Sequence, residues 1–160
     1  MRAGLAGMVF GTGLWLACAS APEQEEQAGV PAEVREVLQG RTVDPRWLAA
    51  AEVWLVAGFV EGTYPCVESE VGLDMIASHA FTPTRVLRGD VKARAIDVRA
   101  YDLQGASFPR ALASGREYLV LLRPSAETRK LLADPGAIFT MATALGPAEV
   151  VAVVELARPR

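Results

Sequence analysis

Two side chains of this sequence, Cys66 and His79, have the types needed for nucleophilic catalysis by a thiol. A thiolate activated by a neighbouring imidazole is the arrangement of cysteine hydrolases. The chain contains a single histidine, so any mechanism that needs an imidazole must use His79. No recognisable nucleophile turn lies between the two residues. We therefore interpret Cys66 as a structural thiol and His79 as a strand-end residue, and we predict no catalytic residue.

The same segment is rich in acids, which raises the question of a metal site. Zinc in proteins is held by a closed set of nitrogen and sulfur ligands at characteristic spacings, and no paired Cys or His spacing occurs here. We predict no metal and no cofactor, and interpret the segment as an exposed acidic loop. Long loops on a rigid scaffold often carry binding residues, so this is our candidate contact surface, formed by Tyr64, Cys66, Glu68, Glu70, Asp74 and His79.

A basic stripe follows the acidic loop and could in principle attract a nucleic acid. It consists of Arg85, Arg88, Lys92, Arg94 and Arg99. Acids interrupt it, aromatic residues for base stacking are missing from it, and the whole chain has a net charge of −3. We therefore expect a solvated strand face and no nucleic-acid partner.

Composition sets the frame for these candidates. The chain has 160 residues, of which 51% are apolar and 22% charged, with 14 Gly, 10 Pro and two Cys. A disordered chain would be less apolar, a collagen-like chain would have more Gly and Pro, and a disulfide scaffold would have more Cys. These values predict one ordinary globular domain.

The first residues read as a signal peptide. Arg2 supplies a positive charge, and residues 3–22 carry no charge and include a hydrophobic stretch. The stretch ends at Leu16-Ala17-Cys18-Ala19-Ser20, which resembles the lipobox of bacterial lipoproteins, although the family prefers Leu at the position of Trp15. The resemblance implies cleavage before Cys18, lipidation of its thiol, and outer-membrane sorting because Ala19 follows it.

Two alternatives remain open for this segment. Ala17-Cys18-Ala19 and Ala19-Ser20-Ala21 also fit ordinary secretory cleavage, which would release a free periplasmic protein. Alternatively, the uncharged stretch stays uncut as a membrane anchor, although its glycines weaken that helix. We predict a signal peptide over residues 1–17, a lipidated Cys18 with a flexible acidic linker over 18–30, and a single β-rich domain over 31–160.

The domain is expected to be mainly β with short helices. The periodicity and capping residues predict helices over 31–39, over 46–51 after Asp44-Pro45, and from Ser125 to Asp134-Pro135. Apolar runs predict strands over 53–60, 79–87, 95–101, 117–122, 139–145 and 150–156. Gly58 indicates a bulge or bend, and Pro83 places its part of the second strand at an edge or a bulge.

Two short strings in this pattern resemble a known fold. They are Arg85-Val86-Leu87-Arg88-Gly89 and Gly115-Arg116-Glu117-Tyr118-Leu119-Val120. With the strand spacing over residues 48–124, they resemble the secreted OB-type barrels related to netrin and tissue-inhibitor-of-metalloproteinase modules. The resemblance implies a small OB-like β-barrel. Those inhibitors present a free N-terminal Cys and several disulfides, and neither feature occurs in this sequence.

Together these observations predict a lipid-anchored protein of the cell envelope. Its membrane contact is the N-terminal lipid, and its small β-barrel binds or positions another envelope protein without catalysis. Two other functions stay open, namely inhibition of an extracytoplasmic protease and a small hydrolase that uses Cys66 and His79.

Overall fold

The computed structural model describes residues 29–63, 66–69, 72–75, 77–100, 111–140, 143–146 and 148–157. For residues 63, 66–69, 72–75, 77 and 100 the description covers the backbone. The predicted signal peptide, the lipidated Cys18, the linker up to residue 28, and the contact residues Tyr64 and Glu70 lie outside the described residues.

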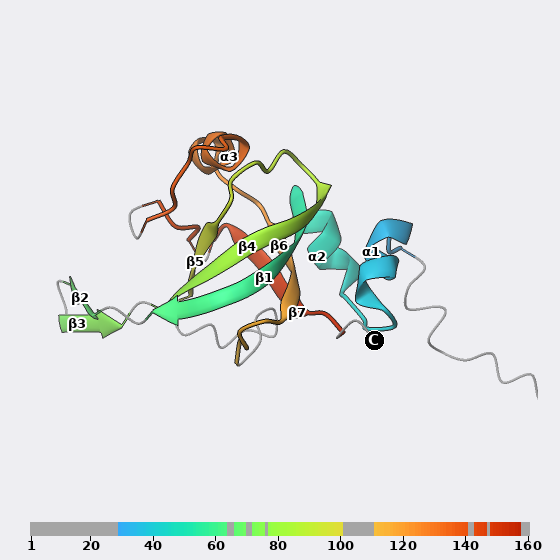
Figure 1. The fold of residues 1–160 in the computed structure, drawn as a ribbon, viewed down its shortest axis with the longest axis horizontal. Helices are drawn as coiled ribbons and strands as arrows, with labels where there is room; N and C mark the ends of the chain where they lie inside the picture. The colour runs from blue at the N-terminus through green and yellow to red at the C-terminus, as the bar shows by residue number, and fades with distance from the viewer. Residues whose placement is uncertain are drawn as a thin grey trace, which may run out of the picture.

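A five-stranded antiparallel sheet forms the body of the protein (Figure 1). Its strand order is β5-β4-β1-β6-β7. The bounds are β1 (Val53–Thr63), β4 (Ala77–Arg88), β5 (Ile96–Ala100), β6 (Glu117–Leu122) and β7 (Val150–Glu155). A two-stranded hairpin of β2 (Cys66–Ser69) and β3 (Gly72–Met75) makes a separate small sheet.

The large sheet curls into a half-barrel that is joined through one parallel contact. Leu145 bridges Val98 on β5, where the Arg99 N–H donates to the Leu145 carbonyl and the Leu145 N–H donates to the Asp97 carbonyl, both at 2.8 Å. Leu145 precedes β7 in the chain, so this contact brings the two ends of the strand order together. The prediction of a mainly β, small barrel-like fold with short helices is confirmed.

Three short helices accompany the sheet, as the capping residues predict. They are α1 (Ala32–Leu38), α2 (Pro45–Ala50) and α3 (Ala126–Ala133). The Asp44 side chain accepts a hydrogen bond from the Arg46 N–H at the start of α2, and the Ser125 side chain accepts one from the Thr128 N–H at the start of α3. These caps satisfy backbone donors that a helix leaves unpaired.

Two hydrophobic cores lie on opposite faces of the central strands β1 and β6. The inner core includes Val53, Leu55, Ala57, Phe59, Phe81, Ile96, Val98, Tyr118, Val120, Leu122, Leu132, Leu145 and Val153. The outer core joins α1 and α2 to the other face and includes Val34, Leu38, Leu48, Trp54, Val56, Leu119, Leu121 and Ala152. Because successive strand residues face opposite sides, a strand between two cores must be apolar throughout, as residues 53–60 are.

Pro83 lies where the sheet tolerates it. The pairing of β4 with β5 covers only Ala77 to Phe81, so Pro83 pairs with Ala57 on β1 and with no described strand on its other side. The β1–β4 register shifts between Val56 and Ala57 and again between Phe59 and Glu61. These irregularities flank Gly58, in agreement with the predicted bulge or bend.

The predicted strand over residues 139–145 is wrong for the part that the structure describes. Of the described residues 139, 140 and 143–145, Leu145 alone is in a bridge. The Thr143 N–H donates to the Thr140 carbonyl at 3.1 Å, and the Thr140 N–H donates to the Thr143 hydroxyl at 2.9 Å. Threonine hydroxyls that bond to local backbone compete with strand pairing, and here they favour a turn.

Candidate functional site

The predicted contact segment forms a hairpin where the sequence indicated a loop. Cys66 pairs with Met75, Val67 with Asp74, and Glu68 with Leu73. On the C-terminal side of position 70, Leu73, Asp74 and Met75 alternate between apolar and polar, and this short signal could have revealed one of the two strands. The hairpin continues beyond the end of the ribbon formed by β1 and β4, on the opposite side of the molecule from α1 and α2 (Figure 1).

The ribbon becomes narrow where it meets the hairpin. The pairs at this end are Gly62 with His79 and Thr63 with Ser78. The pairing of β6 with β1 ends at Gly58, so among the described ladders residues 61–63 of β1 pair with β4 alone. The base of the hairpin is therefore held to the barrel through β4 and its other neighbour, β5.

His79, the last residue of the predicted contact set, lies at this base and is buried with 7% of its surface exposed. Its ring centroid is 6.0 Å from that of Phe59. A Cβ added to Gly62, its cross-strand partner, would lie 3.0 Å from the imidazole Nδ1. The imidazole therefore occupies the space that a side chain at position 62 would need. Burial lowers the pKa of His79, and the nearby carboxylate of Asp97 partly offsets that effect.

Two carboxyl groups share the end of the ribbon with His79. Glu61 and Asp97 both pair with Ala80, from β1 and β5 respectively, so they flank it on one face of the sheet. Burial raises the pKa of Asp97, the hydroxyl of Ser78 and the charge of His79 act to lower it, and the charge of Glu61 raises it further. This end of the ribbon thus gathers the ionisable groups of three strands.

The described geometry does not assemble a serine triad. Ser78 and His79 are consecutive in β4, so their side chains point to opposite faces. His79 is on the face of Phe81, which belongs to the inner core, whereas Asp97 pairs with Ala80 on the face of Ser78. The side chain of Cys66 lies outside the description, so the pairing of its thiol with His79 stays untested. Among the described residues, no group of three His, Cys, Asp or Glu could hold a metal ion.

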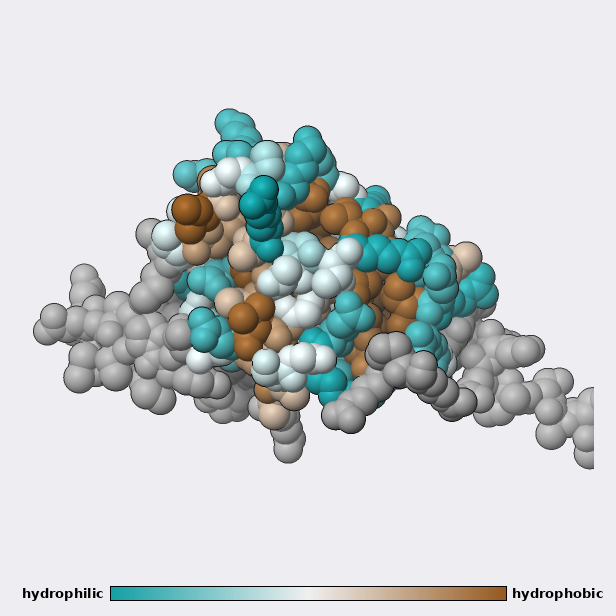
Figure 2. Space-filling view, in the orientation of Figure 1, coloured by the Kyte–Doolittle hydropathy of each residue, from teal (hydrophilic) through white to brown (hydrophobic). Residues whose placement is uncertain are grey.

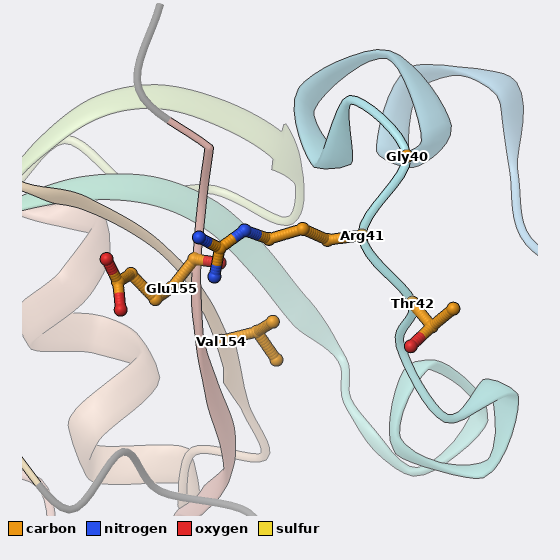
Figure 3. A pocket seen from close by; sticks show the side chains of 5 residues that line it. All are labelled: Gly40, Arg41, Thr42, Val154 and Glu155. Carbon is orange, nitrogen blue, oxygen red and sulfur yellow. The ribbon is translucent and has the colours of Figure 1, made fainter.

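A shallow depression lies next to strand β7, far from the predicted contact segment in the sequence. Gly40, Arg41, Thr42, Val154 and Glu155 line it (Figure 3). Arg41 reaches across it and donates to the Glu155 carbonyl at 3.0 Å, while the Glu155 carboxylate pairs with Arg116 at 3.0 Å. No sequence pattern links the connection between α1 and α2 to β7, so sequence reasoning missed this feature. Its charged side chains already have partners, since Arg41 bonds to the backbone of β7 and Glu155 pairs with Arg116.

The basic stripe is divided among local partners. Arg85 pairs with Glu36 of α1 and Lys92 with Asp90, both at 3.3 Å, and the guanidinium of Arg88 lies 4.9 Å from the Trp54 ring centroid. Figure 2 shows hydrophilic residues spread among apolar ones over the visible face, without one dominant patch. Arg85 and Arg88 are exposed on β4, as expected for a solvated strand face, but Lys92 and Arg94 lie in the connection between β4 and β5 and so are not on a strand.

Comparisons with protein families, curated proteins and solved structures find no match for this chain. The lipobox and the netrin-related resemblance therefore stay predictions. No helix within the described residues is long and apolar enough to cross a bilayer.

Proposed function

We propose that this chain is a lipid-anchored protein of the cell envelope that uses its β2–β3 hairpin to bind another envelope protein. The lipid on Cys18 fixes the location, the acidic linker provides reach, and the half-barrel presents the hairpin to the partner. The activity is binding, and no step of covalent chemistry is part of it.

The observation that carries the proposal is the position of the hairpin. The segment that the sequence indicates as a contact surface forms a separate two-stranded sheet at the end of the ribbon. Helix α1, which follows the predicted linker in the chain, lies on the other side of the molecule (Figure 1). A strand pair that carries Glu68 and Asp74, on the other side of the molecule from α1, is suited to contact a partner that lies away from the proposed lipid anchor.

Site-specific photo-crosslinking in cells tests the proposed contact. A crosslinking amino acid at Glu68 of the full chain is expected to capture one protein, whereas the same amino acid at the exposed Arg35 of α1 is the matched control. Capture at both positions, or at neither, would contradict the proposal.

A hairpin replacement provides a second, independent check. Since Thr63 pairs directly with Ser78, residues 64–77 can be replaced by Asn-Gly, which makes a two-residue hairpin turn in that register. The variant should keep its circular-dichroism spectrum and lose the partner in affinity purification. Retention of the partner would exclude the hairpin as the contact.

Labelling with a fatty-acid analogue tests the anchor. The full chain should incorporate the label and fractionate with membranes, and Cys18→Ala should lose both properties. Unlabelled wild-type protein in the soluble fraction would instead favour ordinary secretory cleavage.

A further inference from the structure

The base of the hairpin carries the single histidine of the chain, His79. Three features of its surroundings bear on how it responds to acid. The ring lies against Phe59 and fills the space above Gly62. The residue is almost completely buried. The pairs at this end of the ribbon, Gly62 with His79 and Thr63 with Ser78, lead directly into the hairpin. We infer that His79 makes the attachment of the hairpin to the barrel sensitive to acid.

The imidazole fits this position in its neutral form. An added proton would place a charge beside an aromatic ring and a glycine backbone, on a residue with 7% of its surface exposed, and burial disfavours the charged form of an imidazole. This is the physical reason that burial lowers the pKa of His79. A histidine held in this way responds to mild acid, where other side chains ordinarily do not change charge.

The neighbouring charges set the size of the response. Asp97 on β5 favours the protonated imidazole, and Glu61 on β1 acts in turn on Asp97. On the same strand pair, Arg99 of β5 lies opposite Ser78 and therefore on the other face of the sheet from His79. The effect of burial on the pKa of His79 is larger than the opposing effect of the Asp97 charge, so the pKa is lowered.

If the imidazole becomes charged, the end of β1 can separate from β4 and give the ring access to water. Residues 61–63 of β1 pair with β4 alone among the described ladders. In contrast, His79 on β4 is also paired with Val98 of β5. The end of β1 therefore separates from β4 at the cost of a few pairs, and the imidazole then reaches water. Acid would loosen the base of the hairpin while the two cores stay intact.

The single histidine makes a direct measurement possible. In the full chain in detergent, the imidazole C–H resonance in a nuclear magnetic resonance titration belongs to His79 alone, and it should titrate below its ordinary pKa of 6.5. Hydrogen exchange of residues 61–63, corrected for intrinsic rates, should rise between about pH 7.5 and pH 5. The opening equilibrium should increase up to about tenfold for each unit by which folding lowers the pKa.

A matched variant separates the imidazole from general acid effects. His79→Phe keeps an aromatic ring beside Phe59 but cannot bind a proton, so exchange at 61–63 should no longer rise as the pH falls from about 7.5 to 5. His79→Gln gives the same test with a smaller side chain if the Phe variant fails to fold. Amides of Leu119 and Val120 in the fully buried part of β6 should stay protected throughout.

Three results would overturn the inference. They are an imidazole that titrates at or above its ordinary value, exchange at 61–63 that does not respond to acid in the wild type, and the same response in both neutral variants. A role for this acid response in partner binding rests on the proposed function, but the measurement itself needs no partner protein. Loss of crosslinking at Glu68 together with an acid-sensitive base would therefore reject the proposed contact and leave this inference standing.

Discussion

The two ends of the β1–β4 ribbon belong to the same pair of strands but are built in different ways. At the near end, Val53, Trp54 and Leu55 are buried on both faces, and Arg88 lies over the indole of Trp54. At the far end, Val60 is 48% exposed and Gly62 leaves room for His79. The near end is held by apolar burial, whereas the far end consists of a few backbone pairs, Gly62 with His79 and Thr63 with Ser78, beside ionisable groups.

This difference separates stability from response. Burial between two cores gives a large and nearly pH-independent contribution to folding, because apolar side chains do not titrate. Ionisable groups give smaller contributions that depend on pH. Because His79, Asp97 and Glu61 lie at the far end, a change of pH can act on the strand pairing there while the two cores keep the sheet folded. The following substitutions test this division.

The largest expected contrast lies within β1 itself. Leu55 is fully buried in the inner core, so Leu55→Ala should lower the free energy of unfolding by about 3 kcal/mol. Val60→Ala, on the same strand but half exposed, should stay within about 0.5 kcal/mol of wild type. Urea denaturation measures both. Similar losses at the two positions would contradict the division between the ends.

The turn after β4 should be nearly as sensitive. Gly89 has a φ of 92°, and a Cβ there would lie 2.8 Å from the Val53 Cγ2, so Gly89→Ala should cost about 2 kcal/mol. The control is Gly40→Ala, where φ is 88° but no atom lies within 4 Å of the new Cβ. The control should cost about 1 kcal/mol. Equal losses in thermal denaturation would show that Val53 does not confine this turn.

Outside the ribbon, Glu149 joins the start of α3 to the turn before β7 through its carboxylate. It accepts the N–H groups of Ser125 at 2.8 Å and Gly146 at 3.1 Å. Burial acts to raise the pKa of Glu149, but hydrogen bonds from Ser125, Thr128 and Gly146 outweigh burial and lower it. Since the folded pKa is lowered, the stabilisation is present above the unfolded value of about 4.5 and is lost as pH falls below it.

Glu149→Gln should therefore cost about 1 kcal/mol at neutral pH, a modest value because the carboxylate is partly exposed. Its effect should shrink in stability curves as the pH falls below about 4.5. His79 acts in another window, since its lowered pKa makes stability fall as pH drops below about 6.5. Acid should thus weaken the far end of the ribbon before the region around Glu149, and the reverse order in pH-resolved hydrogen exchange would contradict this prediction.

The smallest effect is expected at the far end. In Gly62→Ala the new Cβ would lie 3.0 Å from the imidazole Nδ1, so the ring must shift by a few tenths of an ångström, at a cost of up to about 1 kcal/mol. Gly58→Ala, where the Cβ meets no atom within 4 Å, should be neutral or slightly stabilising. Denaturation measures both, and the imidazole resonance should move in the Gly62 variant alone. A shift of that resonance in both variants would contradict the close contact.

Elements with strong local signals were predictable. Asp44-Pro45 and Ser125 mark helix starts because their side chains bond to the first turn. The alternation of Ile96 and Val98 with Asp97 and Arg99 also holds, with the first two fully buried. The hairpin was interpreted as a loop because its strands have only four residues each, too few for a reliable period. The turn at Thr140 was missed because its decisive hydroxyl bonds lie within an apolar run.

By itself, the sequence determined the class of fold, most element boundaries and the presence of a buried strand at residues 53–60, because capping, alternation and hydrophobicity act over a few neighbouring residues. It also marked the acidic segment around Cys66 as different from the rest. The tertiary structure alone decided that β1 lies between two cores, that Leu145 returns to Val98, and that His79 fills the space above Gly62. These contacts join residues distant in the chain, and their partners are selected by how the strands pair and curl rather than by any local pattern.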